Sequence, residues 1–239
     1  MRSNVIGILS AVTLGAITLV SCGDEANSIP TAQELSSSLV TADDLDGEWS
    51  LFTGPQGGDE DIDPSGILTD EQRELVPSFD LCDKASDDAK KAAEGLRPVV
   101  FRQLDLTVDE EIDPPFDRTG HLIFLQEFLY TGDENEMAAT FASVRDGLTD
   151  CLGDIPAGEE GPGRAESLDV PAVGDERIGV LTTIEEAGGW AEWRIQNLIM
   201  RDGPVMMSLV LVDIRADVDP YFSTGAFGEI VRIAVDKLP

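Results

Sequence analysis

The chain has 239 residues and carries 47 Asp and Glu against 16 Lys and Arg, a formal net charge of −31. This excess of negative charge excludes a nucleic-acid-binding role, because phosphate recognition needs clustered Lys and Arg. It also opposes attachment to anionic lipid headgroups, so membrane attachment has to come from an anchor. With 42% hydrophobic residues, the composition is that of a globular protein long enough to bury a substantial core.

The N-terminus has the features of an export signal. Arg2 precedes an apolar run over residues 5–20, which contains Gly, Ser and Thr and is shorter than the roughly 20 residues that a membrane span needs. The run ends in Leu-Val-Ser-Cys at residues 19–22, which resembles the bacterial lipobox. That resemblance implies cleavage after Ser21 and acyl chains such as palmitate, carried by a diacylglycerol thioether on Cys22. The alternative is an uncleaved anchor, or an ordinary signal with a chance cysteine.

The predicted organisation therefore has three parts: a signal peptide over residues 1–21, a lipidated tether over 22–30 and an extracytoplasmic domain over 31–239. Each buried methylene contributes about 0.8 kcal/mol, so one acyl chain holds a protein marginally and two hold it stably. A lipidated Cys22 carries at least two chains. We expect the membrane to be a partner through Cys22, with the domain at the outer face of the cytoplasmic membrane in the cell envelope.

The two remaining cysteines, Cys82 and Cys151, form an even set in an oxidising compartment. We therefore predict a disulfide between them. The alternative is two separate buried thiols.

Periodicity and capping signals predict a series of helices and strands. Thr31 and Glu34 have capping-box spacing, and Asp219 with Pro220 suits the cap and first turn of a last helix. Residues 153–166 are rich in Gly and Glu and are expected to be a break between elements. The predicted helices cover residues 31–39, a start at 41–45, a piece from 68, 83–96, 133–152 and the stretch after 219, and the predicted strands cover 47–52, 98–106, 121–130, 177–184, 190–200 and 205–214.

Two of these strands are apolar on both sides of their alternation. For residues 121–130 this pattern is typical of a central strand that is covered on both faces. In residues 205–212, one side should meet the core and the other a helix or a ligand. An Asp-Gly pair at 202–203 predicts a hairpin between the last two strands. The sequence thus predicts an α+β fold, in which helices pack on a twisted, mainly antiparallel sheet in a single mature domain.

The residues with catalytic or metal-binding chemistry form no recognisable site. His121 is the only histidine, and no nucleophile motif accompanies it. Asp59, Asp61 and Asp63 have the alternate spacing of a calcium loop, but Pro64 stands where the loop needs glycine. We therefore expect no cofactor, no metal and no enzymatic activity.

The features that suit ligand binding are aromatic and methionine side chains near the last hairpin. Trp190 and Trp193 point to opposite faces of one strand, so one is expected in the core and the other either forms a binding platform or lies partly buried at a rim. Met206 and Val210 lie on the strand that is apolar on both sides, where a covering helix is the alternative to a ligand. These four residues are the predicted site for a small apolar or glycan ligand.

Several short stretches resemble the actinobacterial extracellular sensor-domain family, which occurs outside a receptor Ser/Thr kinase (kinase H) and as stand-alone lipoproteins. They are residues 39–45 ahead of Trp49, the helix ending at Cys151, residues 171–176, the strand at 205–213 and the closing helix. The resemblance implies an antiparallel sheet with helices, a ligand cleft and two disulfides. This chain has cysteines for only one of them, and it contains no kinase, so a signalling role would need a partner.

Three functions are compatible with this sequence. The first is a non-catalytic, membrane-anchored ligand-binding or sensor module. The second is an envelope lipoprotein that binds another protein and has no small ligand. The third is a hydrolase acting on the cell envelope, for which no catalytic motif is present.

Replacement of Cys22 by alanine should release the protein from the membrane, because the acyl chains can no longer be attached. Detergent phase partitioning of cells expressing each form measures this. We expect the wild type in the detergent phase and Cys22→Ala in the aqueous phase; equal retention of both forms would contradict lipid anchoring.

Overall fold

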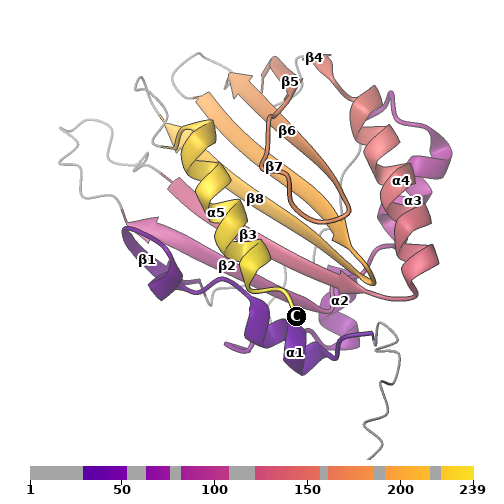
Figure 1. Ribbon diagram of the computed structural model, residues 1–239. Helices are drawn as coiled ribbons and strands as arrows, with labels where there is room; N and C mark the ends of the chain where they lie inside the picture. The colour runs from indigo at the N-terminus through magenta and orange to yellow at the C-terminus, as the bar shows by residue number, and fades with distance from the viewer. Residues whose placement is uncertain are drawn as a thin grey trace, which may run out of the picture.

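The computed structural model describes residues 29–52, 63–75, 82–107, 122–156, 161–185, 192–215 and 222–239. These residues form a single α+β domain around one open sheet of eight antiparallel strands, as the sequence predicts (Figure 1). The spatial order is β1-β2-β3-β8-β7-β6-β5-β4. The strands are β1 (Glu48–Leu51), β2 (Val100–Thr107), β3 (Leu122–Thr131), β4 (Gly153–Ile155), β5 (Gly163–Ser167), β6 (Glu176–Glu185), β7 (Glu192–Asp202) and β8 (Val205–Arg215).

The helices pack on both faces of this sheet. The predicted capping box is present at the first helix, where Thr31 accepts from the backbone of Glu34 and the Glu34 carboxylate accepts from Thr31. In Figure 1, α5 lies along the sheet, and α4 packs beside α3 at one end. The helices are α1 (Ala32–Ser38), the 3₁₀ helix η1 (Ala42–Asp44), α2 (Asp70–Leu75), α3 (Asp87–Gly95), α4 (Glu134–Asp150) and α5 (Thr224–Asp236).

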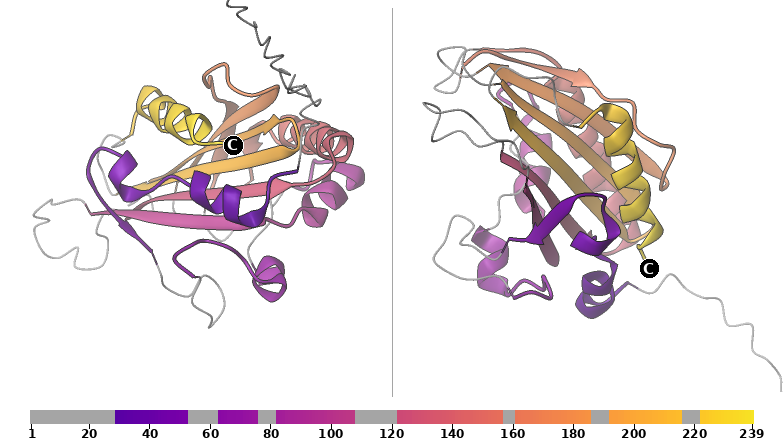
Figure 2. Two further views of the ribbon diagram at one scale, coloured as in Figure 1. Left: turned by 60° about the horizontal axis from the view of Figure 1, so that its bottom comes forward. Right: turned by 90° about the vertical axis from the view of Figure 1, so that its left-hand side faces the viewer.

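The sheet has two differently covered faces, which we call the α5 face and the α4 face. Figure 2 shows α5 and α1 on one side of the sheet and α2 on the other. The core of the α5 face joins α1 and α5, the latter through Phe227, to alternate residues of the strands, among them Leu125, Leu129, Met207 and Leu209. The core of the α4 face joins α3 and α4, the latter through Phe141, to the intervening strand residues, among them Phe101, Phe128, Ile199 and Met206.

The centre of the sheet is β8, which pairs with β3 on one side and β7 on the other. The β3–β8 register runs from Leu122 opposite Ile214 to Thr131 opposite Val205. The predicted hairpin joins β7 to β8, and Gly203 in its turn has a φ of +50°, in the left-handed region that favours glycine.

The break predicted over residues 153–166 is wrong in part, because β4 and β5 pair there at the sheet edge. Their outward side chains are charged: Arg164 forms ion pairs with Asp154 at 2.9 Å and Glu166 at 2.8 Å. Edge strands tolerate such charge, since it protects the unpaired edge. These two strands can therefore form without an apolar alternation in their sequence, and for this reason a prediction from hydropathy missed them.

Two helices begin later than predicted. Ser223, not Asp219, caps α5, and its hydroxyl accepts from the N–H of Ala226 at 3.1 Å. Asp219 and Pro220 lie outside the described residues. Ser86 caps α3 in the same way, so that helix starts at residue 87 and not at 83. In both cases a serine nearer the apolar stripe supplies the cap.

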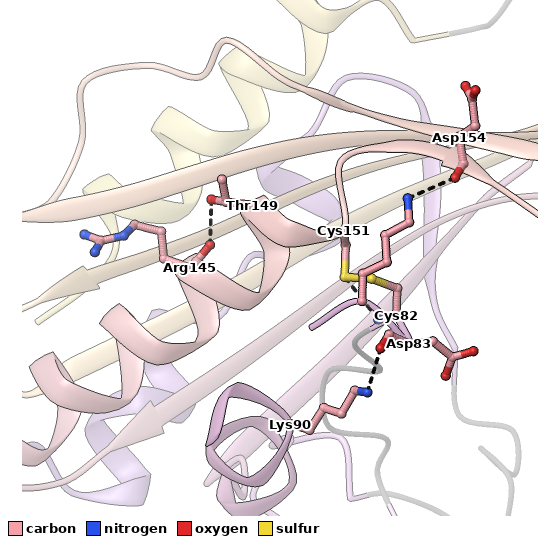
Figure 3. The surroundings of a disulfide bond; sticks show 8 residues. Cys82, Asp83, Lys90, Arg145, Thr149, Cys151 and Asp154 are labelled. Atoms are coloured by element: carbon pink, nitrogen blue, oxygen red, sulfur yellow. Dashed lines mark hydrogen bonds between the residues drawn. A yellow bond between two sulfur atoms is a disulfide. The ribbon is translucent and has the colours of Figure 1, made fainter. Parts of the chain in front are cut away.

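The predicted disulfide between Cys82 and Cys151 is present (Figure 3). Cys151 is the C-cap of α4, and Cys82 begins the segment that leads into α3. The bond thus joins the C-terminal end of α4 to the segment that precedes α3, the helix that packs beside it. Around it, Lys90 donates to the carbonyl of Asp83 at 3.1 Å.

Reduction of this disulfide should lower the free energy of unfolding by about 4 kcal/mol, less any strain in the native bond. The reason is that the bond closes a loop with a sequence separation of 69 residues in the unfolded chain. Urea unfolding of the oxidised and reduced protein, monitored by far-UV circular dichroism, measures this difference. The double variant C82A/C151A should match the reduced form, and equal midpoints for all three forms would contradict the expectation.

Candidate functional site

The α4 face is covered by helices over only part of its length. Phe141 and Val144 of α4 are fully buried against Ile199 of β7 and Met206 of β8. This part lies at the β7–β8 turn, because Met206 is next to the residue that opens β8. The helix predicted over residues 133–152 thus packs on the sheet.

The other half of this face, which we call the distal half, carries apolar side chains that remain partly exposed. Successive rows cross three strands in register: Gln126, Val210 and Asn197, then Phe124, Val212 and Ile195, then Leu122, Ile214 and Trp193. Leu122 is 48% exposed, and Phe124, Ile195, Val210, Ile214 and Trp193 are half-buried. Six apolar side chains therefore form a broad surface beyond the helix-covered half.

The prediction that residues 121–130 are covered on both faces therefore holds for only part of β3. Phe128 and Tyr130 are buried under the helices, whereas Leu122 and Phe124 keep contact with solvent. The strand is central, as predicted, but on the α4 face it extends beyond the helices that cover it.

A polar row marks the boundary between the two halves. Gln126 donates to Gln103 at 2.9 Å, and Gln103 donates to Asp105 at 2.9 Å. Further along the face, Asn197 Oδ1 and Ser208 Oγ are buried without a hydrogen-bond partner among the described residues. Each buried polar atom without a hydrogen bond lowers the free energy of unfolding by about 1–3 kcal/mol, so hydrogen bonding is incomplete at this boundary.

The four predicted ligand residues lie in different places. Trp193 and Val210 are both on the distal half, while Met206 is completely buried beneath α4 and does not reach this surface. Trp190 lies outside the described residues, as do Cys22 and His121.

Sequence reasoning did not single out Phe124, Ile195 and Ile214. The apolar alternation within each strand could have indicated which face each residue lies on. Only the register between the strands, however, places the three residues on one surface.

An open hollow of ≈ 450 Å³ lies between α4 and the beginning of β6. Two of its lining carboxylates are paired with Arg201, which donates to Glu176 at 3.0 Å and lies 3.2 Å from Asp175. Arg145 approaches Glu176 from α4 at 3.5 Å. The lining residues are Phe141, Arg145, Ser167, Leu168, Asp169, Val170, Asp175, Glu176, Arg177, Ile178 and Gly179.

Two of the carboxylates that line this hollow, Asp175 and Glu176, are thus paired with arginines. That arrangement favours a structural role over acid–base chemistry, which needs a group free to move a proton. In the described ranges, no three His, Cys, Asp or Glu side chains gather as metal ligands would. Within the same ranges, no helix has the length and apolar character to span a membrane.

No protein-family model matches this chain, and no curated protein matches it. Among solved structures, it is similar to the extracellular domain of PknH from Mycobacterium tuberculosis, with a TM-score of 0.40, 18% identity and coverage of 64% of this chain and 71% of that one. It is also similar to the Rv0999 ortholog from Mycobacterium smegmatis, a putative uncharacterized protein, with a TM-score of 0.43, 12% identity and coverage of 87% and 96%.

A third similar structure is LpqN of Mycobacterium tuberculosis, which is described as involved in cell envelope biogenesis. Its TM-score is 0.30, with 12% identity and coverage of 67% of this chain and 83% of that one. The resemblance predicted from sequence is therefore found among solved structures, since the PknH extracellular domain is one of them. At these identities and TM-scores, no ligand, partner or residue role follows from it.

Replacement of Arg201 by alanine should lower the free energy of unfolding by about 2–3 kcal/mol, because Asp175 and Glu176 would lose a nearly buried partner. Urea denaturation measures this change. Arg164→Ala is the matched control, since it removes two ion pairs whose side chains are largely exposed, and it should leave the midpoint unchanged. Equal effects of the two substitutions would argue against the importance of burial at Arg201.

Proposed function

We propose that this protein is a lipid-anchored, extracytoplasmic, non-catalytic module that binds an apolar ligand on the distal half of the α4 face. The lipobox resemblance at residues 19–22 supports the anchor, and the disulfide fits an oxidising compartment outside the cytoplasm. The net charge of −31 favours a neutral ligand over an anionic one.

The observation that carries the ligand site is the contrast between the two halves of one sheet face. Apolar residues under α4 are fully buried, whereas six of the seven apolar residues of the distal half stay partly exposed, Val212 being the buried one. Contiguous apolar surface on a soluble domain marks an interaction site, because its exposure to water is unfavourable. Trp193 adds a flat ring that can lie against an apolar chain or the apolar side of a sugar.

A protein partner in the envelope is the second candidate for this surface. Leu122 at its margin is 48% exposed, which suits a flat contact better than an enclosed ligand. Native mass spectrometry of the mature protein separates the two, since a small ligand adds a mass of a few hundred daltons and a partner adds a whole chain.

Binding of N-phenyl-1-naphthylamine, a neutral apolar fluorophore, tests the site directly. Trp193→Ser should weaken this binding about tenfold, because removing the ring takes roughly 60 Å² of apolar contact away from the probe. Leu51→Ser is the matched control, since Leu51 is a 39% exposed leucine paired with Leu104 on β2, away from the distal half. Titration of the soluble Cys22→Ala form by probe fluorescence measures both affinities; equal loss in both variants, or no binding by the unsubstituted form, would refute the proposed site.

A further inference from the structure

Glu127 is a carboxylic acid in the interior of the α5 face, where its residue is 2% exposed. Its Oε2 accepts a hydrogen bond from the backbone N–H of Val40 at 2.7 Å. Its Oε1 is buried and has no hydrogen-bond partner among the described residues. A charged carboxylate needs several donors when it is removed from water, so one hydrogen bond leaves the ionised form poorly stabilised.

The nearest cations do not supply the missing hydrogen bonds. Arg102 lies directly opposite Glu127 in the β2–β3 register, but its Nη1 donates to the carbonyls of Leu39 at 3.3 Å and Val40 at 3.1 Å. Its Nη2 donates to the carbonyl of Pro64 at 3.3 Å. Arg102 therefore holds the same backbone segment as Glu127 and acts on the carboxylate only through space.

The other charged groups that face Glu127 are Lys237, beyond the end of α5, and Asp44 of η1, and these two form an ion pair with each other. Burial raises the pKa of Glu127 to about 7, against the lowering effects of the Val40 N–H, Arg102 and Lys237, while Asp44 raises it further. Burial also raises the pKa of Asp44, but hydrogen bonds from Lys237 and Thr41 outweigh this and hold it at about 2. Of the two acids, only Glu127 changes its charge near neutral pH.

These contacts converge on residues 39–45, which follow α1 and include η1. Leu39 and Val40 are buried in the core of the α5 face, and their backbone groups are bound by Arg102 and Glu127. This segment follows the stretch predicted to be the tether to the membrane. We propose that Glu127 is a proton-operated latch: its protonated side chain holds residues 39–45 firmly on the sheet, and loss of the proton loosens them.

The way in which the attachment of residues 39–45 changes with pH follows from the pKa of Glu127 in the closed and open forms. In the closed structure its pKa is about 7, above the ordinary value of 4.5 that it would recover in water when the segment opens. The closed form therefore binds the proton more tightly than the open form. The stabilisation of the closed form by this proton is complete below about pH 4.5 and is lost as the pH rises through 7. The ion pair of Asp44 and Lys237 persists throughout this range, so it provides a constant second attachment.

Hydrogen exchange of residues 36–45 at pH 5.5 and pH 8.0 tests the latch, after correction for the intrinsic pH dependence of exchange. We expect protection in the wild type to fall about tenfold between these pH values. Glu127→Gln keeps an acceptor for Val40 and mimics the neutral acid, so its protection should stay high at both. Glu94→Gln on the exposed side of α3 is the matched control and should behave as the wild type.

A pH-independent protection in the wild type, or the same tenfold fall in Glu127→Gln, would overturn the proposal. Should Glu127→Gln fail to fold, the carboxyl ¹³C shift of Glu127 in the wild type gives the answer instead. Titration of this carbon near pH 7 supports the latch, and titration near pH 4.5 refutes it. Neither measurement depends on the proposed ligand, so the latch and the binding site are tested independently of each other.

Discussion

The pairing of β3 with β8 is the constraint on which the rest of the molecule depends. It joins residues about eighty positions apart in the sequence, and every other strand extends outward from these two. Both strands carry apolar residues on both faces, so helices have to approach from both sides. Because the side-chain period of a strand is two, a shift of one residue in this register would exchange the two cores. The register thus decides which residues α4 and α5 meet.

The helices cover the two faces unequally, and the candidate site results from this inequality. Helix α4 packs over the end of the sheet near the β7–β8 turn, and the disulfide at Cys151 fixes its C-terminal end to the segment before α3. The strands continue beyond the helix-covered part, carrying Trp193 and Phe124 into a half-exposed surface. Within the described part of the chain, the sheet is longer than its covering helices and leaves apolar side chains partly exposed, which is a common basis for binding.

On the opposite face, the N-terminal segment is held by polar groups as well as by apolar packing. Glu127 and Arg102 sit side by side on neighbouring strands, yet both bind backbone groups of the same crossing segment. An apolar pair at these positions would avoid the cost of burying charge. In the proposed latch, the buried acid ties the attachment of residues 39–45 to its own protonation state. The two proposals, binding and control of the N-terminal segment, therefore concern separate faces of the sheet.

The sequence by itself predicted the elements whose signal is local. Short sequence windows were enough to predict the cap at Thr31, the helix at residues 133–152 and the turn before β8. A count of the cysteines was enough to predict the disulfide. It missed β4 and β5, because an exposed edge strand needs no apolar pattern. Only the tertiary structure placed Trp193 and Phe124 on one surface and put Met206 under α4, since these outcomes depend on the register and on where a helix ends over the sheet. The burial of Glu127 was equally invisible, because a single acid in an apolar strand does not reveal which chain segment will cover it.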